Sequence, residues 1–409
     1  MRIAVWHNLP SGGGKRALHD HLEGLAGRGH EIEIWNPPTA DGGYLPLGGF
    51  GREHSVALDW PVRSDWRDRL HLRPPQEAQL NAMEAHARRC AEEIGRGGFD
   101  VLFANSCQYF RTTPIGRLVD LPSVLYLQEP FRWLYEAMPR LPWVAPDPAS
   151  GLGLRRWRRA AADQLRVWGL RVQAREELRN ARAFDRILVN SFFSRESVLR
   201  AYGLESDVCY LGVDLDRFRD RGEARQPTVL GLGSFTPEKG VEFAIRAVAA
   251  LPEPRPRLVW IGNYVEEGYL THMTALAAEL GVVFEPKARV SDATIFDELN
   301  SACAMIYAPR LEPFGLAPIE AGACGLPVVA VAEGGVRETV VDSVNGLVVE
   351  PRPTAAAAAL ARLFNEPELY ARLRAAARRD VVAKWSLEAA TDRIEAKLFE
   401  VAGRDRTAA

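Results

Sequence analysis

Cysteines and long apolar runs are scarce in this 409-residue chain, and each scarcity excludes a class of protein. No apolar run reaches the roughly 18 residues that a membrane-spanning helix needs. The apolar run after Arg2 is too short for a signal peptide, so we expect a cytoplasmic protein. The cysteines form no C-x-x-C pair and their total is odd, which argues for a reducing compartment without a structural zinc site. These cysteines are Cys90, Cys107, Cys209, Cys303 and Cys324.

An excess of charge of either sign is also missing. The chain has 51 Lys and Arg against 53 Asp and Glu, a net charge of −2 that gives no general case for nucleic-acid binding. With 47% hydrophobic and 25% charged residues, the composition is that of a globular protein, and the length favours two or three domains. Residues 1–205 have a net charge of +4 and the remainder −6, so we expect the first half to meet an anionic acceptor.

The hydrophobic pattern alternates between strands and helices twice along the chain. A short apolar strand at 2–6, a glycine loop, a helix and the strand EIEIW form a βαβ unit, which requires a parallel sheet. The pattern restarts after position 205 with TVLGLGSF, RLVWIGN and AMIYAPR. We therefore predict an α/β protein with two doubly wound, Rossmann-like domains, at 1–205 and 206–384.

One segment, Leu154–Arg182, interrupts this alternation with nine arginines and two tryptophans. A basic helix with tryptophans can lie on an anionic membrane surface. An arginine-rich helix can equally cover the edge of the first domain, with its aliphatic stems packed and its charged ends in solvent. Both interpretations stay open, and the first would place the protein peripherally on the inner face of a membrane.

The segment from Tyr307 to Val349 has the strongest chemical signal. A strand that ends at Tyr307 leads to Glu312, and a helix that contains Glu320 follows. This puts two carboxylates at the carboxyl edge of a parallel sheet, where ligands bind. The helix N-terminus next to them offers unpaired N–H groups to a phosphate. Carboxylates there can accept hydrogen bonds from sugar hydroxyls.

The segment around Glu312 and Glu320 resembles the second domain of the family-4 retaining glycosyltransferases, whose E-x7-E signature it matches without gaps. Further stretches resemble that family in the same order: GGGKRALHDHLEGLAGRGHEIEIW, FDRILVNSFFSRESVLRAYG, YLGVDLDRF and GSFTPEKGVEFAI. The resemblance implies the GT-B fold, in which two Rossmann-like domains face a central cleft. It also implies that 385–409 return to the first domain.

The resemblance assigns roles to individual residues. Glu312 would contact the donor sugar and Lys239 would neutralise the diphosphate, so these two are the catalytic candidates. Glu320 would bind the ribose hydroxyls of the nucleotide. The remaining donor-side candidates are Gly13, Gly14, Ser234, Arg310, Phe314, Gly315 and Leu316.

The chain departs from the family at several positions. Ser234 stands where an arginine is common, and Arg310 either compensates for that phosphate partner or is a solvated side chain. Asn105 and Gln128 occupy places where the family has histidines. The segment QEPFRWLYE still resembles an acceptor-facing loop, with Gln128, Glu129 and Arg132 as its candidates.

The function implied is retaining transfer of a sugar from a nucleoside diphosphate to a hydroxyl on a glycan or lipid-linked acceptor. In such front-face transfer the departing phosphate accepts the acceptor's proton, so neither a protein nucleophile nor a metal is required. We dismiss two metal-like patterns, Asp214–Asp216 in a crossing motif and His19–His21, whose members lie on different helix faces. Two alternatives remain: a GT-B epimerase of nucleotide sugars, and a nucleotide-sugar-binding protein that has lost its activity.

Overall fold

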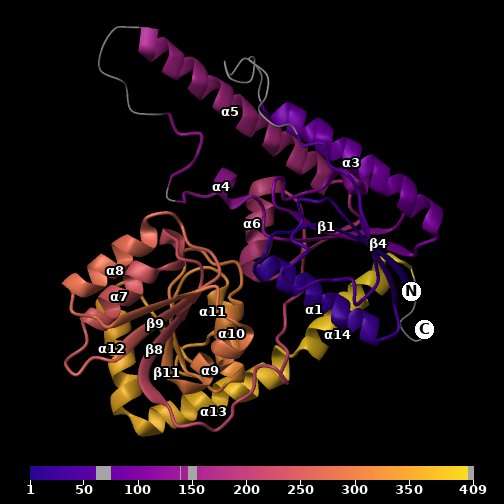
Figure 1. Ribbon diagram of the computed structural model, residues 1–409. Helices are drawn as coiled ribbons and strands as arrows, with labels where there is room; N and C mark the ends of the chain where they lie inside the picture. The colour runs from indigo at the N-terminus through magenta and orange to yellow at the C-terminus, as the bar shows by residue number, and fades with distance from the viewer. Residues whose placement is uncertain (61–74, 139, 146–153, 404–409) are drawn as a thin grey trace. The chain divides into compact units, whose positions relative to one another are not determined.

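The computed structural model describes residues 1–60, 75–138, 140–145 and 154–403, and these form two compact units (Figure 1). The first unit comprises Met1–Asn190, Ser194–Cys209 and the C-terminal segment from Asp392. The second comprises Ser191–Phe193 and Tyr210–Thr391. Each unit has its own parallel sheet and its own hydrophobic core. The prediction of two Rossmann-like α/β domains is therefore confirmed.

The first unit contains a seven-stranded sheet in the order β3-β2-β1-β4-β5-β6-β7, and every pairing is parallel. Its strands are β1 (Arg2–Asn8), β2 (Glu31–Asn36), β3 (Arg52–Ser55), β4 (Val101–Cys107), β5 (Ser123–Gln128), β6 (Arg186–Val189) and β7 (Asp207–Val208). The edge strands β3 and β7 were not predicted from the sequence. They are short, and none of their side chains is buried, so they lack the hydrophobic alternation that identifies a strand.

The second unit contains a six-stranded parallel sheet in the order β10-β9-β8-β11-β12-β13. Its strands are β8 (Gln226–Leu232), β9 (Arg257–Gly262), β10 (Phe284–Ala288), β11 (Ala302–Tyr307), β12 (Val328–Val331) and β13 (Leu347–Val349). Alternate residues of these strands face one core, as Leu258 and Trp260 of β9 and Ala304 and Ile306 of β11 do. These strands are buried, which explains why they read as continuous apolar runs.

The helices connect successive strands, as parallel pairing requires. Those that begin in the first half of the chain are α1 (Gly13–Gly27), α3 (Pro75–Gly97), α4 (Arg132–Tyr135), α5 (Leu154–Ala181) and α6 (Phe192–Tyr202). The later ones are α7 (Val241–Ala249), α8 (Tyr269–Glu279), α9 (Asp292–Ser301), α10 (Leu316–Ala323), α11 (Val336–Thr339), α12 (Pro353–Asn365), α13 (Pro367–Lys384) and α14 (Leu387–Val401). Among the described residues, no helix combines the length and apolarity needed to cross a bilayer.

The arginine-rich segment forms α5, and its two halves differ in burial. Residues 156–162 are all exposed, whereas Val172, Glu177 and Asn180 are almost completely buried. Glu177 accepts hydrogen bonds from the hydroxyl of Tyr202 (2.8 Å) and the amide of Gln173 (3.0 Å). Only the second half of α5 therefore covers the first unit in the way that the packing interpretation predicts.

Candidate active site

The second sheet reverses its strand order between β8 and β11. From β8 the sheet continues to β9 and β10 on one side, and from β11 it continues to β12 and β13 on the other. Connections from β8 and β11 consequently leave in opposite directions and open a crevice at their carboxyl ends. Such a switch point is where open α/β sheets bind ligands.

Lys239 and Glu312 lie together at this switch point. Lys239 ends the short 3₁₀ turn that follows β8, and Glu312 belongs to the loop that follows β11. The Lys239 Nζ donates to Glu312 Oε2 across 2.8 Å, and their side chains are 30% and 16% exposed. The structure thus brings the two catalytic candidates into one charge-assisted contact at a solvent-accessible place.

Helix α10 begins beside this pair. Its N-cap, Gly315, has a φ of 95°, and a Cβ there would lie 3.3 Å from the ring of Tyr307. Glu320 lies inside α10 and is buried. Burial and the nearby carboxylates of Glu312 and Glu320 raise the pKa of Tyr307 well above its ordinary value. Both glutamates therefore lie close to one phenol, next to the free N–H groups at a helix start.

Two glycines hold the loop that carries Glu312. A Cβ on Gly334 would lie 2.3 Å from the carbonyl oxygen of Glu312, and one on Gly335 would lie 2.1 Å from that of Pro313. The Gly335 N–H donates to the Glu312 carbonyl across 2.7 Å. The loop can take this path only because no side chain stands at 334 and 335. The sequence interpretation gave these glycines no role, although they lie within the segment that it examined.

Arg310 and Phe314 flank Glu312 in the same loop. The guanidinium of Arg310 is 2.9 Å from the carboxylate of Glu333, and the Arg310 side chain is 67% exposed. Phe314 is buried, with its ring centroid 5.6 Å from that of Trp385. Its side chain is part of the core, so only its backbone is available for the donor contact that the resemblance implies, and Leu316 follows at the start of α10.

Ser234 lies on the β8 side of the crevice. It is half-buried, and its backbone carbonyl accepts a hydrogen bond from the N–H of Thr236 (3.0 Å). The Thr236 hydroxyl is buried and has no partner among the described residues. The neighbouring Gly240 has a φ of 81° and its Cβ position would meet the Ala308 carbonyl at 2.4 Å, which draws the loops after β8 and β11 together.

The first sheet has its own switch point, between β1 and β4. Gly13 and Gly14 follow β1 and open α1, and the Cβ position of Gly14 lies 3.3 Å from the side chain of Gln128. Gln128 ends β5 with a φ of 64°, a conformation that costs a non-glycine residue about 1–3 kcal/mol. Its Nε2 is buried without a partner among the described residues. Strain of this kind is typical of ligand-binding positions.

Buried polar groups surround this second edge. Asn105, near the end of β4, is fully buried and neither of its amide atoms has a partner in the described part of the chain. Burial and then Lys15 lower the pKa of His7 to about 3, so this imidazole is neutral. Burial also lowers the pKa of Lys15, which follows the glycine loop and is 1% exposed. Sequence analysis missed His7 and Lys15 as members of the site, although lysine is rare in this chain.

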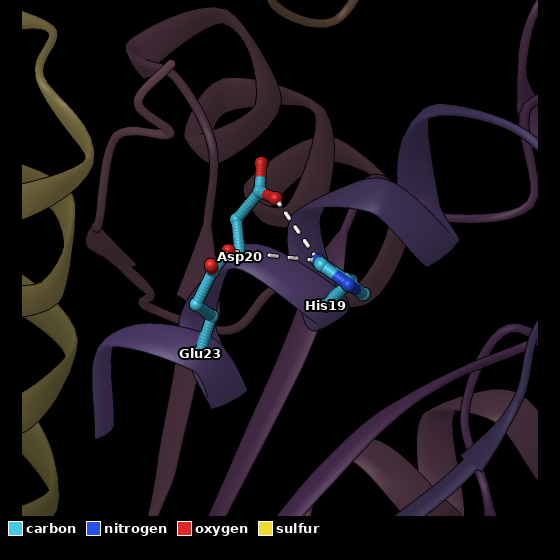
Figure 2. A group of neighbouring side chains, drawn as sticks. All are labelled: His19, Asp20 and Glu23. Atoms are coloured by element: carbon cyan, nitrogen blue, oxygen red, sulfur yellow. Dashed lines mark hydrogen bonds and ion pairs between the residues drawn. The ribbon is translucent and has the colours of Figure 1, made fainter. Parts of the chain in front are cut away.

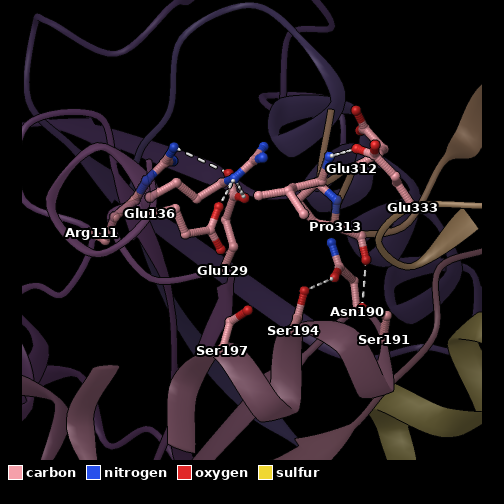
Figure 3. Close-up of polar contacts among 12 residues, drawn as sticks. Arg111, Glu129, Glu136, Asn190, Ser191, Ser194, Ser197, Glu312, Pro313 and Glu333 are labelled. Atoms are coloured by element: carbon pink, nitrogen blue, oxygen red, sulfur yellow. Dashed lines mark hydrogen bonds and ion pairs between the residues drawn. The ribbon is translucent and has the colours of Figure 1, made fainter. Parts of the chain in front are cut away.

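Glu129 and Arg132 form a charge cluster together with a residue that the sequence analysis missed. Glu129 lies 3.3 Å from the guanidinium of Arg111 (Figure 3) and 3.4 Å from that of Arg132. Arg132 also pairs with Glu136 at 2.9 Å. Arg111 follows β4 and carries no motif, so only the adjacency of β4 and β5 reveals its place in the cluster.

One group among the described residues has the composition of a metal site. The potential ligand atoms of His19, Asp20 and Glu23 lie within 4.8 Å of one another on α1 (Figure 2). His19 Nδ1 is 3.3 Å from a carboxylate oxygen of Asp20 and 3.9 Å from one of Glu23. The Asp214 carboxylate accepts hydrogen bonds from the backbone N–H groups of Asp216 (2.8 Å) and Arg217 (3.2 Å), which gives it a local turn-forming role.

Comparison with known protein families identifies the chain. Residues 11–217, half of its length, match the family model described as Glycosyltransferase Family 4, and residues 214–380 match that of Glycosyl transferases group 1. The chain belongs to glycosyltransferase family 4. The predicted family is thereby confirmed, together with the GT-B fold class.

Sequence relatives of this chain are named D-inositol 3-phosphate glycosyltransferase. The chain is 36% identical over 185 residues to D-inositol 3-phosphate glycosyltransferase of Mycobacterium leprae, covering 40% of this chain and 42% of the relative. It is 32% identical over 241 residues to the enzyme of that name from Streptomyces avermitilis, covering 52% of each. The match therefore spans about half the length of these relatives.

Solved structures resemble the glycosyltransferase over almost its full length. Sucrose-phosphate synthase from Thermosynechococcus elongatus has a TM-score of 0.72 at 18% identity, covering 98% of this chain and 100% of the other. HepE from Anabaena, solved with UDP and glucose, has a TM-score of 0.70 at 18% identity with the same coverage. At these identities the likeness concerns the fold.

Proposed function

We propose that this protein is a retaining glycosyltransferase that transfers a hexose from a nucleoside diphosphate to a hydroxyl acceptor. The observation that carries the proposal is the contact between Lys239 and Glu312 at the switch point of the second sheet, beside the N-terminus of α10. A cation, a sugar-binding carboxylate and a helix N-terminus are the groups that a sugar diphosphate needs. HepE, which shares the fold, was solved with UDP and glucose.

In this proposal the second unit stabilises the leaving diphosphate. Lys239 and the N–H groups at the start of α10 take up the charge that develops as the bond between the anomeric carbon and the phosphate oxygen breaks. Glu312 leaves Lys239 and accepts hydrogen bonds from the sugar hydroxyls, while Glu320 binds the ribose. Ser234 and Arg310 lie on the two sides of the diphosphate.

The acceptor oxygen then bonds to the anomeric carbon on the face that the diphosphate leaves, and its proton passes to the departing phosphate oxygen. No protein nucleophile takes part, and no metal is required because Lys239 and α10 supply the positive charge. Activity that persists in a chelator would agree with this assignment. Activity that is lost in a chelator and restored by magnesium would contradict it.

The first unit supplies the acceptor side of the reaction. Gln128, Glu129 and Arg132 lie at the carboxyl end of β5, and Arg111 adds a second guanidinium beside Glu129. Two arginines favour a negatively charged acceptor, such as a phosphorylated polyol, an acidic glycan or a lipid-linked phosphate. The relatives named for D-inositol 3-phosphate agree with such an acceptor.

Thermal stabilisation by UDP, GDP and ADP tests the donor assignment. A nucleotide at about 100 times its Kd adds roughly 2.7 kcal/mol to the free energy of unfolding, which is a readily measured rise in melting temperature. We expect one nucleotide to stabilise the protein without magnesium, and Glu320→Ala to abolish the effect. Stabilisation by none of them would contradict donor binding. Binding without transfer to phosphorylated, glycan or lipid acceptors would instead favour a binding protein.

A further inference from the structure

The exposed tryptophans of this protein are concentrated in one part of the chain. Among the described residues, every tryptophan with a largely exposed side chain lies between positions 133 and 168. Trp157 and Trp168, both on α5, are 77% and 50% exposed. Large aromatic side chains are normally buried, so a helix that presents two of them to solvent indicates an interaction surface.

Helix geometry places these tryptophans on the same side as a row of arginines. At about 100° per residue, Trp157, Trp168, Arg171, Arg175 and Arg179 fall within about 80° of one another. We call these five residues the Trp–Arg face. All five are exposed, and the arginines at 175 and 179 have side chains that are 63% and 60% accessible.

The buried residues of α5 show which side of the helix packs against the first unit. Gly169, Gln173, Glu177 and Asn180 are buried, and the same count places them about 120–160° from the centre of the Trp–Arg face. Asn180 accepts a hydrogen bond from Arg117 at 2.8 Å, which helps to anchor the helix to the first unit. A helix anchored in this way can present the Trp–Arg face to a partner without ordering a mobile segment.

The charged residues of the Trp–Arg face are all arginines, so its charge is positive. The three acidic residues of α5 lie at other positions around the helix, and Asp163 pairs with Arg166 at 3.0 Å. Glu176 lies 2.8 Å from Arg175 and 3.7 Å from Arg179, but its own side chain is only 11% exposed. The outward surface is therefore basic, over a length of about 33 Å from position 157 to 179.

We propose that the Trp–Arg face binds the surface of an anionic lipid bilayer. Arginines contribute about 1 kcal/mol each when they lie near an anionic membrane surface, and tryptophan rings settle at the level of the headgroups. An anionic polymer would account for the arginines but leave two exposed indoles without a favourable environment. The two indoles lie about 16 Å apart along the helix, so both can enter the same interface when α5 lies flat.

Co-sedimentation of the full chain with vesicles tests this proposal. We expect binding to phosphatidylcholine vesicles that contain phosphatidylglycerol, much weaker binding to pure phosphatidylcholine, and loss of binding at high salt. Arg171→Gln with Arg175→Gln should weaken binding by about 30-fold, and leaves Arg179 to pair with Glu176. Absence of binding at low ionic strength would overturn the proposal.

The matched control removes the same charge from another side of the same helix. By the same count, Arg158 and Arg159 lie about 100–160° from the centre of the Trp–Arg face. The double variant Arg158→Gln with Arg159→Gln should therefore weaken binding far less. Equal losses in the two double variants would show that only net charge matters and would overturn the face assignment. Melting temperatures of all variants establish that the fold is intact.

A second variant tests the tryptophans independently. Vesicles should shift tryptophan emission to the blue in the wild-type protein, and Trp157→Ser with Trp168→Ser should lose both the shift and most of the binding. A polyanion such as heparin should produce no such shift. Equal binding of this variant and the wild-type protein to vesicles, or a preference for heparin over anionic vesicles, would overturn the choice of a bilayer.

Discussion

The two units present different chemistry at equivalent places. Both sheets reverse their strand order at an internal pair of strands, β1 and β4 in the first and β8 and β11 in the second. The second switch point holds an accessible pair of opposite charges, Lys239 and Glu312. The first holds buried neutral groups, including Asn105 and a neutral His7. One architecture therefore carries an accessible pair of opposite charges in one unit and strained, largely buried polar groups in the other.

The difference in exposure explains this contrast. A charged pair at a solvated edge keeps its charge and can exchange partners with an incoming diphosphate. Imidazoles in the interior stay neutral because burial penalises their charged form, and burial raises the cost of every missing hydrogen bond of an amide. We therefore expect substitutions at the switch point of the second unit to change activity. Substitutions at that of the first unit should change both activity and the free energy of unfolding.

The largest expected effect is the loss of transfer when the charged pair is broken. Glu312→Ala or Lys239→Ala should lower kcat/KM by about 100- to 1000-fold, because each removes a group proposed to act on the transition state. Steady-state transfer assays measure this effect. Lys384→Ala is the control, since it breaks another ion pair of the second unit, the 2.6 Å contact with Asp380. Full activity of both site variants would refute the role of the pair.

Acid should destabilise the first unit more than the second. Burial lowers the pKa of His21 to about 4, so the folded state resists protonation while the unfolded chain takes up a proton below about pH 6.5. Stability from this residue is complete above pH 6.5 and is lost as the pH falls toward 4, by about 3 kcal/mol in total.

Urea unfolding at pH 7 and pH 4.5 measures this loss. His21→Leu should reduce the difference in the free energy of unfolding between the two pH values by about 2–3 kcal/mol. His272→Leu, at an exposed position of the second unit, should leave that difference unchanged. The same pH dependence in His21→Leu and wild-type protein would show that this imidazole does not account for the contrast.

A methyl group added at Gly335, which contacts the loop that carries Glu312, should lower activity without changing any charge. Gly335→Ala places a Cβ 2.1 Å from the Pro313 carbonyl oxygen, so the loop must shift, and transfer should fall by about 10- to 100-fold. Kinetics of the folded variant, checked by its melting temperature, test this. Gly95→Ala, with no atom within 4 Å of its added Cβ, should retain full activity. Wild-type kinetics in both variants would show that the loop position is unimportant.

The smallest expected effect is the release of backbone strain at Gln128. Gln128→Gly should raise the free energy of unfolding by about 1 kcal/mol, because glycine adopts a φ of 64° without strain. It should also raise KM for the acceptor, which chemical denaturation and acceptor titrations would detect together. Ser343→Gly, at a φ of 59° in a turn of the second unit, should gain stability and keep its KM. A stabilised Gln128 variant with unchanged acceptor kinetics would remove it from the site.

Local patterns identified much of this protein in advance. Alternation of apolar runs predicted two doubly wound units, since buried parallel strands must be apolar throughout. The segment from Glu312 to Glu320 could be interpreted because a loop and the first turns of a helix are contiguous in sequence. The edge strands β3 and β7 escaped prediction, because few of their side chains contribute to a core.

Contacts between distant residues could not be anticipated in the same way. Arg111 pairs with Glu129 because β4 and β5 are neighbours in the sheet, and nothing in the sequence around Arg111 predicts that ion pair. The strain at Gln128 likewise follows from the path of the chain beside Gly14. Burial decides the protonation of His7 and His21, and a sequence carries no measure of burial for a single polar residue.

The fold class and the loop that contains Glu312 could be predicted from the sequence alone because both depend on short-range order, and the family followed from the resemblance of its motifs to known sequences. Tertiary structure decided that Lys239 meets Glu312 from 73 positions away, since that contact needs β8 and β11 to be adjacent. It also decided which half of α5 is packed and which is exposed. The sequence of an arginine-rich helix does not show whether the helix packs on its own protein or binds a membrane. Distinguishing these possibilities requires the tertiary structure, which shows which side chains of the helix are buried.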